Sequence, residues 1–170
     1  MGISYKTTNI SSDEFQAACD LVNAERQLSI VLTEARLREV DFVVIATLNT
    51  EVVGVSCIKK QEPIAEIGYT AVCPNHRRMK IGMRMTQLII DHAMHNQIDL
   101  ACGIVYESNM ANRKKLEKIG FFEVTKYLSK AGDKMLCWYC HPLLKSESEA
   151  QSMMISYIEK RKKNRFKTKG

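Results

Sequence analysis

Residues 72–83 read Val72-Cys-Pro-Asn-His-Arg-Arg-Met-Lys-Ile-Gly-Met83, and this stretch is the most informative part of the sequence. The run before it, about 64 to 73, is rich in apolar residues and ends at Pro74, because proline cannot donate a hydrogen bond to a strand ladder. From Ile81 onward, apolar residues recur at helical spacing, at positions 81, 85, 88, 89 and 93. The stretch is therefore the turn from a strand into a helix, and its loop is rich in cations.

Strands and helices alternate on both sides of this turn. Ser11 and Glu14 match a capping box, which predicts a helix over 12–25, and Thr33 is the predicted N-cap of a shorter helix. A strand precedes the first helix, and the β-rich runs 42–46 and 51–58 predict a hairpin. Strands are then predicted over 98–106, 121–128 and 134–143, and helices over 109–119 and 153–162. This order favours a mixed α/β sheet with ligands at residues 70–83 and 104–113.

The composition describes one globular domain with a basic end. The 170 residues are 45% hydrophobic and 26% charged, which excludes wholesale disorder and a coiled-coil rod. Residues 159–170 hold seven basic residues and one acidic residue, and this accounts for the whole net charge of +6. We expect a domain over 1–145, followed by a C-terminal helix and solvated basic tail over 146–170. Cutting after Ile158 is then expected to leave the fold intact.

No targeting or membrane segment is evident. No apolar run approaches the roughly 18 to 20 residues that span a bilayer, and the N-terminus lacks a signal-peptide hydrophobic stretch. We therefore expect a cytoplasmic protein with no membrane partner, in which the six cysteines are small apolar residues. Cys137 and Cys140 have the spacing of a metal-binding pair, but the sequence has no second such pair. We therefore expect no bound metal. The alternative is a metal or redox site at these two cysteines.

The cations of the central loop suit an anion. A helix begins with unpaired N–H groups and the positive end of its dipole, so a diphosphate could bind there beside Arg77, Arg78 and Lys80. The loop lacks the Gly-Lys-Ser/Thr sequence of a Walker loop. The alternative interpretation is an ordinary solvated basic loop.

Two motifs resemble those of the GNAT superfamily of N-acetyltransferases. The central loop is similar to the family's acyl-CoA pyrophosphate loop, Arg/Gln-x-x-Gly-x-Gly/Ala, with Arg77 first, Gly82 last and Lys80 in place of the middle glycine. Residues 109–121 are similar to the later motif, Asn-x-x-Ala/Ser followed by Leu/Tyr-Glu-Lys-x-Gly-Phe. Asn112 replaces its small residue, and Leu116 replaces the tyrosine that many members use as general acid. The motifs and the strand order together cover residues 41–128.

The resemblance implies both a fold and a cofactor. The fold is a mixed, mostly antiparallel central sheet of about seven strands, splayed between strands 4 and 5 and flanked by helices. The cofactor is acetyl-CoA, acting as co-substrate. The residues implied to bind it are Val72, Arg77, Arg78, Met79, Lys80, Ile81, Gly82, Met83, Asn109 and Asn112.

The chemistry needs a base and an oxyanion donor. An alkyl amine with a pKa near 10 is almost wholly protonated at pH 7, so a base must take its proton. Glu66 is placed like the catalytic glutamate of the histone-acetylating branch of the family, and the alternative is an exposed strand carboxylate without a role. The resemblance also implies that a backbone N–H around Val72 stabilises the tetrahedral oxyanion. Asn109 is compatible with both a pantetheine contact and a helix N-cap.

These observations favour an N-acetyltransferase that moves an acetyl group from acetyl-CoA to a primary amine by direct, general-base-assisted attack. We expect the acceptor to be a small molecule or a protein. The sequence leaves open whether the chain forms a homodimer. The alternative is a degenerate GNAT-like binding module whose basic tail contacts RNA, the ribosome or an acidic protein. The tail, with Phe166 among its Lys and Arg residues, is also compatible with weak nucleic-acid contact.

Overall fold

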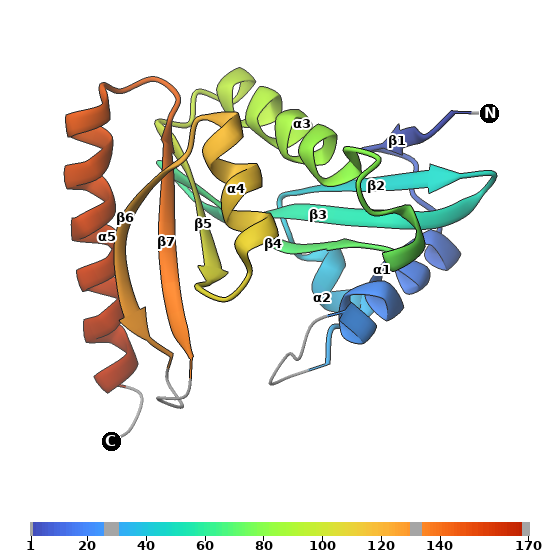
Figure 1. Ribbon diagram of the computed structural model, residues 1–170, viewed down its shortest axis with the longest axis horizontal. Coiled ribbons are helices and arrows are strands. Elements are labelled where there is room, and N and C mark those ends of the chain that lie inside the picture. Colours follow the sequence, from blue (N-terminus) through green and yellow to red (C-terminus); the bar gives the residue numbers. More distant parts are fainter. Residues whose placement is uncertain (1, 26–30, 130–133, 168–170) are drawn as a thin grey trace.

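The computed structural model describes residues 2–25, 31–129 and 134–167, and for 60, 61 and 163–167 it describes the backbone only. Seven strands form a single sheet in the order β1-β2-β3-β4-β5-β7-β6 (Figure 1). In chain order the elements are β1 (Ser4–Lys6), α1 (Ser12–Glu25), α2 (Glu34–Arg38), β2 (Phe42–Leu48), β3 (Glu51–Gln61), β4 (Ile64–Val72), α3 (Ile81–His95), β5 (Leu100–Tyr106), α4 (Met110–Ile119), β6 (Phe122–Leu128), β7 (Met135–Pro142) and α5 (Glu147–Lys167).

The sheet separates in its middle. Every neighbouring pair of strands is antiparallel except β4 and β5, which run parallel. These two strands pair only from residues 64–67 to residues 100–103, although β4 continues to Val72 and β5 to Tyr106. Their carboxyl-terminal halves therefore diverge. This arrangement confirms the predicted mixed, mostly antiparallel sheet that splays between strands 4 and 5.

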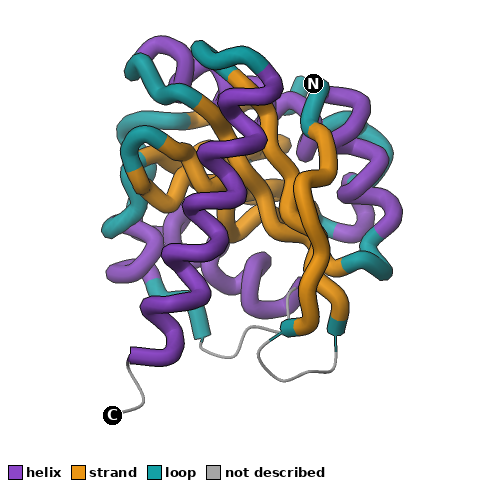
Figure 2. The backbone as a smooth tube through the Cα atoms, turned by 90° about the vertical axis from the view of Figure 1, so that its left-hand side faces the viewer, coloured by secondary structure: helices purple, strands orange, loops and turns teal. Residues whose placement is uncertain are grey.

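Helices cover both faces of the sheet. Because successive strand residues point to opposite faces, Val44 and Ala46 join the core under α3 and α4, whereas Val43 and Ile45 join the core under α1 and α2. A third core cluster lies under α5, which crosses β6 and β7 (Figure 2). The helices α1, α2 and α5 therefore share one face of the sheet, and α3 and α4 cover the other.

Local capping signals behave as the sequence predicts. The Ser11 backbone N–H donates to Glu14 Oε2 (3.0 Å), and the Glu14 N–H donates to Ser11 Oγ (3.2 Å), which is a complete capping box before α1. Thr33 caps α2, and Gly120 ends α4 in the left-handed conformation with φ of 102°. These contacts confirm the predicted start of α1 and end of α4.

The C-terminal helix is longer than predicted. It begins at Glu147, where the Ser146 N–H donates to Glu149 Oε2 (3.0 Å) in the manner of a second capping box, and it continues to Lys167. Its apolar residues Ala150, Met154 and Ile158 are buried at four-residue spacing against the sheet. The next turn brings Arg161 to Glu66. The expectation of a solvated tail from residue 159 is therefore wrong at Arg161, because this side chain pairs with a buried carboxylate.

Two further expectations from the sequence concern the apolar character of the cysteines and the question of a membrane span. The six cysteines, all within the described residues, form no disulfide bonds with one another, and five of them are buried, as expected of small apolar residues. Within the described parts of the chain, no helix combines the length and apolar character that a membrane span needs.

Candidate active site

The loop between β4 and α3 has a backbone that suits glycine. Arg78 and Lys80 adopt left-handed conformations, with φ of 69° and 60°. For residues with a Cβ this conformation costs about 1–2 kcal/mol. Lys80 stands where the resembling motif has its middle glycine, and its left-handed φ is one that glycine adopts without this cost. Lys80 is also the N-cap of α3, where its side chain makes no capping hydrogen bond.

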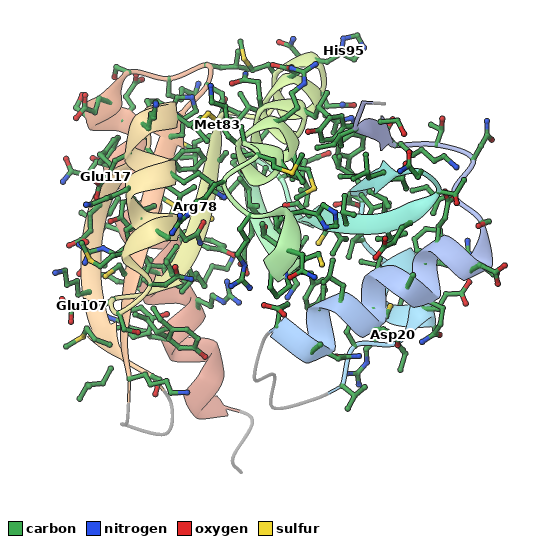
Figure 3. The ribbon with its side chains drawn as sticks, turned by 45° about the vertical axis from the view of Figure 1, so that its right-hand side comes forward. Asp20, Arg78, Met83, His95, Glu107 and Glu117 are labelled. Atoms are coloured by element: carbon green, nitrogen blue, oxygen red, sulfur yellow. The ribbon has the colours of Figure 1, made fainter. Side chains whose placement is uncertain are left out.

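The cations of this loop surround the start of α3. Arg77 Nε donates to the Val72 carbonyl (3.4 Å), and its guanidinium pairs with Glu25, the last residue of α1. Arg78 precedes α3 and Met83 lies in its first turn, and in Figure 3 both are on the side of α3 that faces α4. The first turn of α3 holds no acidic residue. The structure therefore brings the predicted cofactor residues 77–83 together around a helix N-terminus that is rich in positive charge.

Val72 presents its backbone to the splayed side of the sheet. It pairs with Gly54 of β3, and the Cys73 N–H donates to the Val53 carbonyl (2.9 Å). In an antiparallel ladder, a hydrogen bond between the flanking residues Cys73 and Val53 means that Val72 and Gly54 are a non-hydrogen-bonded pair. The N–H of Val72 therefore points away from β3, toward the side on which β5 has separated.

Gly82 marks the place where β4, α3 and α4 meet. A Cβ on Gly82 would lie 3.6 Å from Val72 Cγ2 and 3.8 Å from Cδ of Lys115 on α4. The side chains of Val72 and Lys115 thus reach the first turn of α3 from two different elements. Lys115 is a residue that the sequence motifs did not single out, because they assign no role to its position.

The start of α4 holds the two predicted asparagines. Asn109 is the N-cap of this helix, and its side-chain oxygen accepts a hydrogen bond from the Asn112 N–H (3.1 Å). Leu116, at the position of the tyrosine in many members, is only 4% exposed. Its Cδ1 would lie 3.7 Å from a Cβ on Gly103, the last β5 residue that pairs with β4. Leu116 is therefore a core residue at the apex of the splay.

Glu66 lies on the other face of the sheet. It pairs in register with Cys102, close to the apex of the splay, and is 7% exposed. Its Oε2 accepts a hydrogen bond from the Tyr157 hydroxyl (3.0 Å) and pairs with Arg161, both on α5. Glu66 is thus not the exposed carboxylate of the alternative interpretation. The structure also does not bring it onto the face that carries α3.

The surroundings of Glu66 perturb its neighbours. Burial raises the pKa of the Tyr157 hydroxyl well above its usual value, and the Glu66 carboxylate raises it further. Burial likewise raises the pKa of the Cys102 thiol, with a smaller contribution from Glu66. Both groups therefore stay protonated at neutral pH. The sequence does carry a signal for the position of Tyr157 and Arg161. They are four residues apart and adjoin the apolar positions 150, 154 and 158, so they lie next to the buried face of one helix.

The splay between β4 and β5 and the basic loop before α3 are features that the motif resemblance led us to expect. The model of the acetyltransferase (GNAT) family matches residues 6–121, more than half of the chain. The chain belongs to the GNAT family, which confirms the resemblance seen in its motifs. The match ends before β6, so α5 lies outside it.

Solved structures share this fold. The ribosomal-protein-S18-alanine N-acetyltransferase from Escherichia coli is 18% identical, with a TM-score of 0.69 over 85% of this chain and 96% of its own. The NatC complex bound to Gag peptide and CoA contains a chain that is 19% identical, with a TM-score of 0.73 over 84% and 99%. The Salmonella typhimurium protein yncA, solved with its cofactor acetyl-CoA, is 13% identical, with a TM-score of 0.71 over 86% and 96%. Identities this low show the fold alone. No curated protein sequence matches the chain.

Proposed function

We propose that the chain is an N-acetyltransferase that moves an acetyl group from acetyl-CoA to a primary amine by direct attack, without a covalent enzyme intermediate. One observation carries this proposal. The N-terminus of α3 has no acidic residue in its first turn, lies beside several cations and adjoins Val72, in the part of β4 that has diverged from β5. Membership of the GNAT family supports the same activity.

Each part of this site has a separate role in holding acetyl-CoA, which supplies the reactive thioester. The N–H groups at residues 79–83 and the guanidinium groups of Arg77 and Arg78 bind the diphosphate. The diverging edges of β4 and β5 receive the pantetheine arm, with Asn109 and Asn112 at the start of α4 beside it. The N–H of Val72 faces the same side, which supports its role as the donor that stabilises the oxyanion.

For the base we propose Glu66. Glu66 is the buried carboxylate near the apex of the splay, where it could take a proton from the acceptor ammonium. Arg161 and Tyr157 both donate hydrogen bonds to Oε2 of Glu66. The proton of the acceptor is therefore taken by the other carboxylate oxygen, Oε1. Leu116 has no proton to give, so the leaving thiolate takes its proton from another group.

The experiment measures acetyl-CoA binding by isothermal titration calorimetry and acetyl transfer to a panel of amines by release of free CoA. We expect micromolar binding for the wild-type protein. Replacing Arg77 and Arg78 with alanine should weaken the affinity at least tenfold, since a hydrogen bond to a charged group contributes about 1.5–3 kcal/mol. Arg36→Ala removes an exposed arginine from α2 and is the matched control, with affinity expected to stay unchanged.

Two results would contradict the proposal in different ways. Unchanged affinity in the double variant would place the phosphates elsewhere on the molecule. Absence of any binding to the wild-type protein would exclude an acetyl-CoA-dependent enzyme, and it would favour the degenerate binding module considered from the sequence.

A further inference from the structure

Lys115 reaches from α4 to the first turn of α3. Its Nζ donates a hydrogen bond to Thr86 Oγ1 (3.2 Å), and Thr86 in turn donates to the Gly82 carbonyl (2.8 Å). Cδ of Lys115 lies 3.8 Å from the position that a Cβ on Gly82 would take. The aliphatic part of this side chain therefore lies directly beside the helix N-terminus, where we place the diphosphate.

Lys115 has no negative partner in the described structure. None of the ion pairs among the described residues includes it. Burial lowers the pKa of Lys115 to about 8, and no neighbouring charge contributes to this shift. The amine is thus mostly protonated at pH 7. The Lys115 side chain is half-buried, and an ammonium that has lost much of its water without gaining a counter-charge is costly, so a bound anion would offset that cost.

The elements around Lys115 add positive charge rather than a carboxylate. The acidic residue on α3, Asp91, lies more than two turns beyond Gly82 and accepts a hydrogen bond from Gln87. On α4, the Glu117 carboxylate accepts a hydrogen bond from the Tyr139 hydroxyl. The other charged residues on α3, on α4 and in the loop are the cations Arg77, Arg78, Lys80, Arg84, Arg113, Lys114 and Lys118.

We infer that Lys115 is a ligand of the acetyl-CoA diphosphate, contributed by α4 across the first turn of α3. This inference rests on the function proposed above and adds a binding residue that the motifs do not contain. Rotation about the last two side-chain bonds would move the ammonium from Thr86 to the phosphate oxygens while Cδ stays beside Gly82. The diphosphate is then held between the α3 N-terminus and a cation from α4.

The test compares Lys115→Met, Lys115→Arg and Lys114→Met by calorimetric titration with acetyl-CoA. Methionine keeps the length of the side chain without its charge, so Lys115→Met should bind about 10- to 100-fold more weakly at pH 7. Lys115→Arg keeps the charge and should stay close to the wild-type affinity. Lys114 is the exposed neighbour on the same helix, and Lys114→Met removes one charge as well but should change the affinity less than threefold.

A pH series gives a readout that a structural role would not move. Only the protonated amine attracts phosphate, so raising the pH from 7 to 9 through the pKa of about 8 should weaken binding to the wild-type protein about tenfold. Lys115→Met and Lys115→Arg should both lack this loss, because neither side chain titrates in that range. S-acetylpantetheine, which has no diphosphate, should bind equally to the wild-type protein and to Lys115→Met.

Three outcomes would overturn the inference. If Lys115→Met binds acetyl-CoA as tightly as the wild-type protein, Lys115 does not contact the cofactor. If it loses affinity for S-acetylpantetheine as well, or loses turnover with binding intact, Lys115 acts at the thioester instead of the diphosphate. If the wild-type protein binds no acetyl-CoA, the proposed function fails, and this inference fails with it.

Discussion

Glu66 illustrates how the surroundings of one side chain define its chemistry. The sequence places a carboxylate near the start of a predicted strand, and the register with Cys102 confirms that position. Its partners Tyr157 and Arg161, however, come from a helix more than 90 residues later in the chain. Strand periodicity shows which face a residue occupies but not which distant helix covers that face. The ion pair of Glu66 could therefore not be predicted from its own motif.

Replacing Glu66 with glutamine tests the proposed base. Glutamine keeps the shape of the side chain but cannot accept a proton at neutral pH, so turnover should fall about 10²-fold or more while acetyl-CoA affinity stays intact. The rate is measured by release of free CoA with an amine acceptor. Normal turnover near pH 7 would remove Glu66 from the mechanism.

The substitution also leaves the Arg161 guanidinium without its carboxylate, so lost activity could reflect lost stability. The double variant Glu66→Gln/Arg161→Gln is the control, because it removes both charges together. If Glu66 is the base, this variant should recover the melting temperature without recovering turnover. Recovery of both would assign Glu66 a structural role only.

Residues within a local motif were predicted better than residues that meet across the fold. The N-cap is one of the two compatible roles that the sequence offers for Asn109, and the hydrogen bond from the Asn112 N–H confirms it, because both partners lie within one turn. Lys115 lies inside the same motif, yet its contact with Thr86 depends on how α3 and α4 pack against each other. The sequence thus identifies the loop and helix of the proposed site, whereas the ammonium between them follows only from tertiary structure.

At the scale of elements, α5 is the part that the sequence described least well. Its helical character was predicted, but the start at Glu147 was missed although Ser146 and Glu149 match a capping box. The basic residues near the end also suggested a solvated tail. A long side chain such as that of Arg161 can lie along an apolar surface and still reach a buried carboxylate, so charge density alone does not exclude packing.

The pair between Arg161 and Glu66 should stabilise the attachment of α5. Arg161→Gln leaves a buried carboxylate without its cation, and breaking a buried pair costs about 3 kcal/mol or more. For a domain of this size we expect the melting temperature to fall by about 6–12 °C. Lys162→Gln, which changes an exposed neighbour, is the control and should leave it nearly unchanged. Equal melting temperatures for both variants would show that the pair contributes little.

At the scale of the whole molecule, the sheet divides the core into clusters that depend on different helices. One cluster lies under α3 and α4, another under α1 and α2, and the third under α5. The order of elements and the two motifs were enough to predict the mixed sheet and its splay. They could not predict that α5 lies on the same face as α1 and α2, because no short-range pattern specifies the side on which a terminal helix packs.

This arrangement predicts that α5 and the GNAT-matched region unfold together. Met154 on α5 and Met85 on α3 are both fully buried, in clusters on opposite faces of the sheet. Shortening either one to alanine should cost about 2–5 kcal/mol. Because the strands β4, β5 and β7 contribute side chains to both clusters, both variants should lower the temperature of one cooperative transition in scanning calorimetry.

The exposed methionine of α3 supplies the matched control. Met94 is 45% exposed, so Met94→Ala should leave the transition close to that of the wild-type protein. The calorimetric and van't Hoff enthalpies of Met154→Ala and Met85→Ala should remain equal, as one cooperative unit requires. If Met154→Ala instead produces a separate low-temperature transition and leaves the main one in place, α5 is an independent addition to the domain. In that case residues 1–145 would fold alone, and the contact of Arg161 with Glu66 could not be needed for stability.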